Sequence, residues 1–177
     1  MKRLIPLIAF IAISIFLYLS LSSNPRELPS PLIGKAFPDI YAEDYYSGEI
    51  ISLREVFSQK MTLVNVWASW CTTCRAEHQM LMQIAKEQSL QMLGVNYKDT
   101  RKEADKVLEA TGNPYDLIVF DPKGEVGLEL GVYATPETFL IDQQGVVIHK
   151  HIGEITQAVW IRDFLQRIAK KRIISNQ

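Results

Sequence analysis

The chain has 177 residues, which is enough for one domain of ordinary size with a hydrophobic core and a short additional segment. Charged residues make up 22% of the sequence and the formal net charge at pH 7 is -1. No basic field exists to hold nucleic acid phosphates, so we exclude nucleic-acid binding. The hydrophobic fraction of 47% comes partly from the first few dozen residues, which must be considered separately.

The N-terminal segment predicts an uncleaved membrane anchor over residues 1–24. Lys2 and Arg3 precede the charge-free, apolar run Leu4–Leu21, which with its uncharged flank can cross a hydrocarbon core of ~30 Å. A cleavable signal is the alternative, but 20–22 (Ser-Leu-Ser) is a poor small-x-small site. A helix of a soluble domain is a weaker alternative, because such a helix would have a polar face and this segment has none. Because positive charge holds the short N-terminal end in the cytoplasm, the rest of the chain is expected to be exported.

Residues 25–36 predict an extended tether, because prolines recur there and large apolar residues are few. The globular domain is expected to cover residues 37–175. No internal repeat or low-complexity tract follows, which argues against a solenoid or a disordered scaffold.

The first half of the domain predicts alternating strands and helices. Residues 61–68 (MTLVNVWA) are almost continuously apolar, as in a strand buried on both faces of a parallel sheet. A helix follows directly, with Leu81, Ile84 and Ala85 on its apolar side and Glu77 expected on its wet side. Residues 90–97 then predict a second strand. A capping box at Thr100 and Glu103 opens a second helix, which stops at Gly112.

The second half predicts a strand, a hairpin and a last helix. The strand 117–120 ends in a turn at Asp121-Pro122-Lys123-Gly124. The segments 137–142 and 146–151 flank Gln143-Gln144-Gly145 as an antiparallel hairpin. Apolar residues at helical spacing over 160–168 precede a basic helix end. The expected fold class is therefore α/β, with a mixed central sheet flanked by helices and preceded by one transmembrane helix.

Cys71 and Cys74, the only cysteines, form a Cys-x-x-Cys motif where a buried strand passes into a helix. A helix N-terminus stabilises negative charge and lowers the pKa of a thiol placed there, so Cys71 is the expected nucleophile. Cys74, one turn deeper, is the expected resolving thiol. A purely structural disulfide is a poor explanation of the pair, because closing so short a loop would stabilise the fold by only about 2 kcal/mol.

Two metal-based alternatives exist for this motif. Cys71, Cys74, His149 and His151 could together form a Cys₂His₂ zinc site, since the two histidines share one strand face. A long helical pattern after the second cysteine disfavours a zinc knuckle, and the histidines are better explained as polar residues of an edge strand. Covalent haem would need histidine after the second cysteine, where the chain has Arg75. No metal or other cofactor is expected beyond the redox-active pair.

Pro136, in Ala134-Thr135-Pro136-Glu137, stands just before a predicted strand, where it must occupy the first position or a special turn. A cis bond is possible at Thr135-Pro136, although only ~5% of such bonds are cis in general.

The segment 65–78 (NVWASWCTTCRAEH) resembles the thioredoxin-like DsbE/CcmG family of cytochrome c biogenesis, as do 94–99 (GVNYKD) and 131–142 (GVYATPETFLID). The resemblance covers the anchor and essentially the whole domain. It implies a thioredoxin-like fold and an enzyme of the inner membrane, with its domain in the periplasm. That enzyme would reduce the Cys-x-x-Cys-His disulfide of apocytochrome c. It would be recharged by a membrane donor of the DsbD or CcdA type and work beside other maturation components.

The resemblance also implies roles for residues around the motif. Pro136 would be cis and lie against the cysteine pair, with Thr135 before it. Glu77 and Glu137 would sit nearby and oppose thiolate formation. Without the resemblance, Glu77 would be an exposed helix residue and Glu137 a strand-edge charge. Trp70, beside the nucleophile, is the candidate for partner contact.

The chain departs from the common pattern of this family at two places. Thr72 stands where proline is frequent, and Ala134-Thr135 where glycine often occurs. Both differences concern the redox potential and the partner range, while leaving the thiol chemistry intact. A broader exported disulfide reductase or oxidase of the same fold is therefore the nearest alternative.

Overall fold

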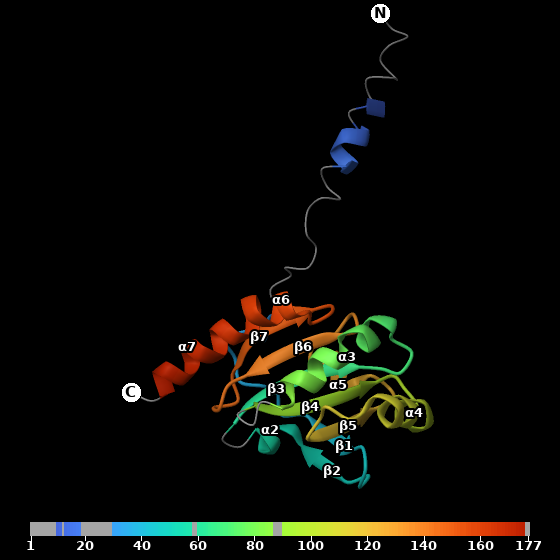
Figure 1. Ribbon diagram of the computed structural model, residues 1–177, viewed down its shortest axis with the longest axis vertical. Helices are drawn as coiled ribbons and strands as arrows, with labels where there is room; N and C mark the ends of the chain where they lie inside the picture. The colour runs from blue at the N-terminus through green and yellow to red at the C-terminus, as the bar shows by residue number, and fades with distance from the viewer. Residues whose placement is uncertain (1–9, 12, 19–29, 58–59, 87–89, 176–177) are drawn as a thin grey trace, which may run out of the picture.

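The computed structural model describes residues 10–11, 13–18, 30–57, 60–86 and 90–175. Its centre is a seven-stranded sheet with the order β2-β1-β5-β4-β3-β6-β7 (Figure 1). The strands are β1 (Tyr41–Asp44), β2 (Ile50–Ser52), β3 (Met61–Trp67), β4 (Leu90–Tyr97), β5 (Leu117–Asp121), β6 (Glu137–Ile141) and β7 (Val147–Ile152). The helices are α2 (Leu53–Val56), α3 (Thr72–Ile84), α4 (Arg101–Thr111), α5 (Glu125–Glu129), α6 (Gln157–Val159), the π-helical η2 (Trp160–Leu165) and α7 (Gln166–Ser175).

The sheet is mixed, as the sequence predicts. β3, β4 and β5 run parallel, while β6 is antiparallel to β3 and β7 to β6. The expected hairpin is present, and its register pairs Phe139 with Lys150. β1 pairs antiparallel with both β2 and β5. The parallel centre places the carboxyl ends of β3, β4 and β5 at one edge, where the chain of β3 turns into α3 (Figure 1).

Helices cover both faces of the sheet and create a core on each side. One core contains side chains from α3, α4, η2 and α7, including Leu81, Leu108 and Phe164. The other contains side chains from α2 and α5, including Leu53 and Val126. Every residue of β3 is buried, because both faces of this central strand are covered. The result is the helix-sheet-helix layering of an α/β domain.

The helix boundaries follow local chemistry. Thr100 Oγ1 accepts a hydrogen bond from the backbone N–H of Glu103 at 3.4 Å, which confirms half of the predicted capping box. Gly112 ends α4 with a φ of 88°. The turn before α5 is also confirmed, since Gly124 N–H donates to the carbonyl of Asp121 at 3.2 Å.

Several elements differ from the predictions. β1, β2, α2 and α5 were not predicted, and the expected last helix begins with the π-helical segment η2. Contacts with the sheet also begin before Phe37, the predicted start of the domain. Gly34 N–H donates to the carbonyl of Val147 at 2.8 Å, and Val147 N–H donates to the carbonyl of Lys35 at 2.9 Å. The end of the predicted tether is therefore attached to β7.

Most of the predicted anchor 1–24 lies outside the described residues. Residues 10–11 and 13–18 are helical and exposed. Within the part of the chain that the structure describes, no helix combines the length and apolar character needed to span a membrane.

Candidate functional site

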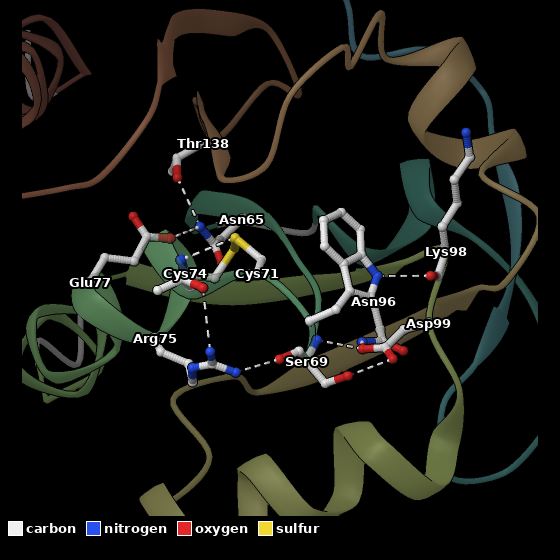
Figure 2. Close-up of a disulfide and its surroundings, with 12 residues drawn as sticks. Asn65, Ser69, Cys71, Cys74, Arg75, Glu77, Asn96, Lys98, Asp99 and Thr138 are labelled. Atoms are coloured by element: carbon white, nitrogen blue, oxygen red, sulfur yellow. Dashed lines mark hydrogen bonds between the residues drawn. A yellow bond between two sulfur atoms is a disulfide. The ribbon is translucent and has the colours of Figure 1, made fainter.

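Cys71 and Cys74 are joined by a disulfide at the start of α3 (Figure 2). Cys71 is the N-cap residue of this helix, and its Sγ accepts a hydrogen bond from the backbone N–H of Cys74 at 3.1 Å. The N-terminus of α3 thus directs the backbone N–H of Cys74 at the first sulfur, which is the arrangement that stabilises a thiolate.

Both cysteines are buried, with exposed fractions of 5% for Cys71 and 6% for Cys74. Cys74 was expected to lie deeper than Cys71, but in this disulfide form the two residues are equally buried. Thr72 and Thr73, between them, are exposed. The helix turn is thus open to a partner through the two threonines rather than through a protruding sulfur.

The loop that leads into Cys71 is fixed by Asp99, which follows β4 (Figure 2). Its carboxylate accepts hydrogen bonds from Ser69 N–H at 2.5 Å and from Ser69 Oγ at 2.7 Å. It also accepts from Asn96 Nδ2 at 3.0 Å and from Thr100 N–H at 2.8 Å. Asp99 was quoted in the sequence motif but not recognised as a site residue. The sequence signal that could have identified Asp99 is its place just after a strand of the parallel sheet, because the carboxyl ends of neighbouring parallel strands lie together.

Trp70, which directly precedes Cys71, is exposed, and its role in partner contact stays a prediction. Its side chain is 56% exposed, and its Nε1 donates to the backbone carbonyl of Lys98 at 2.9 Å. Lys98 has a φ of 47°, an uncommon conformation for a residue other than glycine. A pocket of about 400 Å³ borders the indole ring. Its lining includes Ser69, Trp70, Arg75, Glu103, Lys106 and Val107.

Glu77 is buried, with an exposed fraction of 1%, so its expected place on the wet side of α3 is wrong. Its Oε1 accepts from Asn65 Nδ2 at 2.9 Å, and its Oε2 accepts from Ile155 N–H at 2.9 Å. Burial raises the pKa of Glu77 to about 7, against the opposing effect of these two hydrogen bonds. Glu77 follows Cys74 by three residues on α3, so the two positions are neighbours on one face of the helix (Figure 2).

A hydrogen-bonded group of buried side chains continues from Glu77 into the core. Asn65 also donates to Thr138 Oγ1 at 3.0 Å and accepts from Tyr115 Oη at 2.7 Å. The Tyr115 ring stacks on Trp67 with a centroid distance of 5.7 Å. Gly94 lies against both rings, because a Cβ there would be 2.9 Å from Tyr115 Cγ and 3.0 Å from Trp67 Nε1. Sequence patterns singled out neither Asn65 nor Tyr115.

The Thr135-Pro136 peptide bond is cis, as the resemblance implies. Pro136 is buried and Thr135 is half-buried. Because Glu137 pairs with Val66, this turn lies at the end of β3 from which the chain continues to the cysteines. The proline and the disulfide therefore occupy the same edge of the sheet.

Glu137 is fully buried, with an exposed fraction of 0%, so the interpretation as a strand-edge charge is wrong. Its Oε1 accepts from the N–H groups of Tyr133 and Ala134, both at 3.1 Å. Lys150 Nζ lies 2.8 Å from Glu137 Oε2, as an ion pair without hydrogen-bond geometry. Glu137 thus holds the segment that precedes the cis proline.

The structure separates the four residues of the zinc alternative. Cys71 and Cys74 are bonded to each other, whereas His149 and His151 group with Asp163. β7 is an edge strand, as expected for the histidines. Burial lowers the pKa of His149 to about 4. A Cys₂His₂ site is therefore not formed in this structure.

The sequence model of the Redoxin family matches residues 32–163. The chain is 46% identical over 169 residues to the thiol:disulfide interchange protein DsbE of Escherichia coli K12, covering 90% of this chain and 91% of that protein. It is 40% identical over 169 residues to DsbE of Allochromatium vinosum, covering 96% and 93%.

Solved structures agree in fold. A secreted thiol-disulfide isomerase from Corynebacterium glutamicum matches with a TM-score of 0.62 and 26% identity, over 70% of this chain and 80% of that chain. A DsbF homologue from Corynebacterium diphtheriae has a TM-score of 0.63 at 23% identity, over 72% of this chain and 83% of that chain. Together with the cysteine pair at the start of α3, these similarities show a thioredoxin-like thiol:disulfide oxidoreductase. The chain belongs to the Redoxin family and, within it, to the DsbE group of thiol:disulfide interchange proteins.

Proposed function

We propose that this protein reduces the disulfide of the Cys-x-x-Cys-His motif in apocytochrome c, on the periplasmic face of the inner membrane, before haem is attached. The observation that carries the proposal is the Cys71–Cys74 disulfide at the N-cap of α3, with the exposed Trp70 next to it in the chain and the buried Glu77 one turn after Cys74 on the same helix. The substrate is proposed from the resemblance of the motif segments to the DsbE/CcmG family.

The reaction is a pair of thiol-disulfide exchanges. The thiolate of Cys71 attacks one sulfur of the substrate disulfide, and the other substrate sulfur leaves as a thiolate. The thiolate of Cys74 then attacks Cys71 Sγ, which forms the Cys71–Cys74 disulfide and releases the second substrate sulfur. The substrate gains two electrons and two protons, and the protein loses them. Glu77, with a pKa of about 7, is placed to take up a proton near Cys74 at neutral pH.

The oxidised protein needs a two-electron donor, which we propose to be a membrane thiol carrier of the DsbD or CcdA type. Retention at the membrane would keep the protein close to that donor and to other cytochrome c maturation components. Lys2, Arg3 and the apolar run after them support an anchor, as do the exposed apolar side chains among residues 10–18. The redox-active disulfide serves as the only cofactor in this proposal.

The test is to trap the partner covalently with Cys74→Ser. Without the resolving thiol, the mixed disulfide at Cys71 can be released only by an outside thiol, so it should survive acid quenching and non-reducing electrophoresis. We expect an adduct with an apocytochrome c that carries Cys-x-x-Cys-His. Cys71→Ser is the matched control and should trap nothing.

The outcomes separate the chemistry from the substrate. Adducts dominated by unrelated exported proteins would contradict the cytochrome assignment and favour a broader exported reductase or oxidase. An adduct with Cys71→Ser but none with Cys74→Ser would reverse the roles of the two cysteines. The redox state in the cell gives an independent measurement, because a reductant should be found largely as the dithiol.

A further inference from the structure

His149, His151 and Asp163 meet at the edge of the sheet, where β7 contacts the C-terminal helical region. The two histidines alternate along β7 and so point to the same face of the strand. Asp163 belongs to η2. One ligand atom from each of the three residues lies within 4.8 Å of the others. Two imidazoles and one carboxylate are thus brought together from two separate elements, β7 and η2.

The two imidazoles are prepared for a ligand in different ways. His149 Nε2 is buried and has no hydrogen-bond partner within the part of the chain that the structure describes. An unpaired polar atom of this kind is costly and calls for an explanation. His151 Nε2 lies 3.2 Å from the backbone carbonyl of Glu154. Metal-binding histidines usually donate one ring N–H to a backbone carbonyl in this way, which fixes the orientation of the ring.

The helical segment that carries Asp163 is itself unusual. Residues Trp160–Leu165 form a π-helix, a rare conformation that frequently marks functional sites. Phe164 packs edge-on against His149, with ring centroids 5.1 Å apart, and also against His151 at 6.2 Å. The aromatic ring holds both imidazoles at their places on β7.

We propose that His149, His151 and Asp163 bind a divalent metal ion of the borderline class, of which Zn²⁺ is the probe, at a site separate from the redox-active cysteines. Two imidazole nitrogens and a carboxylate oxygen suit such an ion, and water would complete a tetrahedral set. The ion would join the edge strand β7 to η2. Arg162 competes with it, because its Nε and guanidinium NH2 group donate to the two carboxylate oxygens of Asp163 at 2.8 Å and 2.6 Å.

Titration calorimetry with Zn²⁺ on the full-length protein tests the site, with the Cys71–Cys74 disulfide kept oxidised so that no thiol can bind. We expect one ion per chain. His149→Gln, His151→Gln and Asp163→Asn should each weaken Zn²⁺ binding by more than about tenfold. A loss of about tenfold is already typical when a residue that only orients a metal ligand is removed, so removal of a ligand should cost more. Arg162→Gln should strengthen binding, because it frees the carboxylate. This expected increase in Zn²⁺ affinity tests the site even if one of the three ligand variants folds poorly.

His78→Gln is the matched control, since His78 is the remaining histidine of the chain and its Nε2 contacts the carbonyl of Gly112 at 3.1 Å instead. It should leave Zn²⁺ affinity unchanged. Absence of saturable binding by the unmodified protein would overturn the proposal. So would a loss of affinity in His78→Gln equal to that in the three ligand variants, or an Asp163→Asn variant that binds as tightly as the unmodified chain.

Discussion

The side-chain amide of Asn65 donates a hydrogen bond of 2.9 Å to the carboxylate of Glu77, and so connects the central strand to the helix that carries the cysteines. Both residues are buried, with exposed fractions of 0% and 1%. The same carboxylate accepts from the backbone N–H of Ile155, so its charge state affects β3, α3 and the loop after β7. Glu77 is therefore expected to make the stability of the protein depend on pH.

Glu77→Gln should flatten the pH dependence of unfolding of the oxidised protein. Burial raises the pKa of Glu77 from 4.5 to about 7 in the folded state, so the folded chain holds a proton that the unfolded chain releases. The free energy of unfolding should fall by about 3 kcal/mol as pH rises from ~4.5 to ~7, and Glu77→Gln should lack this fall. Urea unfolding at a series of pH values measures it. Glu109→Gln, at an exposed position of α4, is the control, and parallel curves for Glu77→Gln and the unmodified protein would contradict the prediction.

Lys150→Met should destabilise the protein by about 3 kcal/mol or more, because it leaves the Glu137 carboxylate buried and unpaired. Lys123→Met removes a lysine that lies 3.9 Å from Glu125 on the surface, and should cost less than about 1 kcal/mol. Chemical denaturation of both variants gives the comparison. Equal losses would show that burial of the Lys150–Glu137 pair has no energetic consequence.

Asp99→Ala should cost about 3 kcal/mol of stability, because buried donors at Ser69 and Asn96 lose their acceptor. It should also slow disulfide exchange, since the loop before Cys71 is released. Asp116→Ala removes an exposed carboxylate that accepts one bond, from Met92 N–H at 2.8 Å, and should cost about 1 kcal/mol. Stopped-flow exchange with a model disulfide, measured beside unfolding, separates the two effects. An exchange rate unchanged in Asp99→Ala would remove Asp99 from the site.

In the reduced protein, Cys71 should be alkylated faster than Cys74 at neutral pH. The N–H of Cys74 faces Cys71 Sγ at 3.1 Å, and a helix N-terminus contributes about 1 kcal/mol toward a thiolate, equal to about fivefold in its population. Peptide mapping after brief iodoacetamide treatment measures both rates. Since the two residues are equally buried in the disulfide form, faster labelling of Cys74 would mean that the helix end does not govern reactivity.

The elements predicted correctly are those whose sequences carry their own signal. β3 is continuously apolar because both its faces are covered, and α4 has a cap at Thr100 and a stop at Gly112. β1 and β2 are short and half-polar, and they exist because Tyr41 pairs with Ser52 and Glu43 with Phe120. Such pairings depend on the folded sheet, so local patterns did not predict them.

The site shows the same division. The helix position of Cys71 and Cys74 followed from their spacing and the strand before them. The burial of Glu77 did not, because its partners Asn65 and Ile155 come from other elements, and helical periodicity places a lone glutamate on the wet side. Glu137 was misplaced for a similar reason, since its cation Lys150 comes from the neighbouring strand of the hairpin.

The close approach at Gly94 has a consequence for how this protein can vary. A methyl group at position 94 would press on the ring of Tyr115, whose hydroxyl holds Asn65, which in turn holds Glu77. Overpacking of this kind costs about 1–3 kcal/mol, and here the displaced ring would disturb the carboxylate beside the cysteines. A methyl group at position 94 carries no polar atom and lies on β4 rather than on α3, yet it would alter the acid-base behaviour of the redox centre. Screens of inherited or engineered variants should count Gly94 among the residues that tune the chemistry.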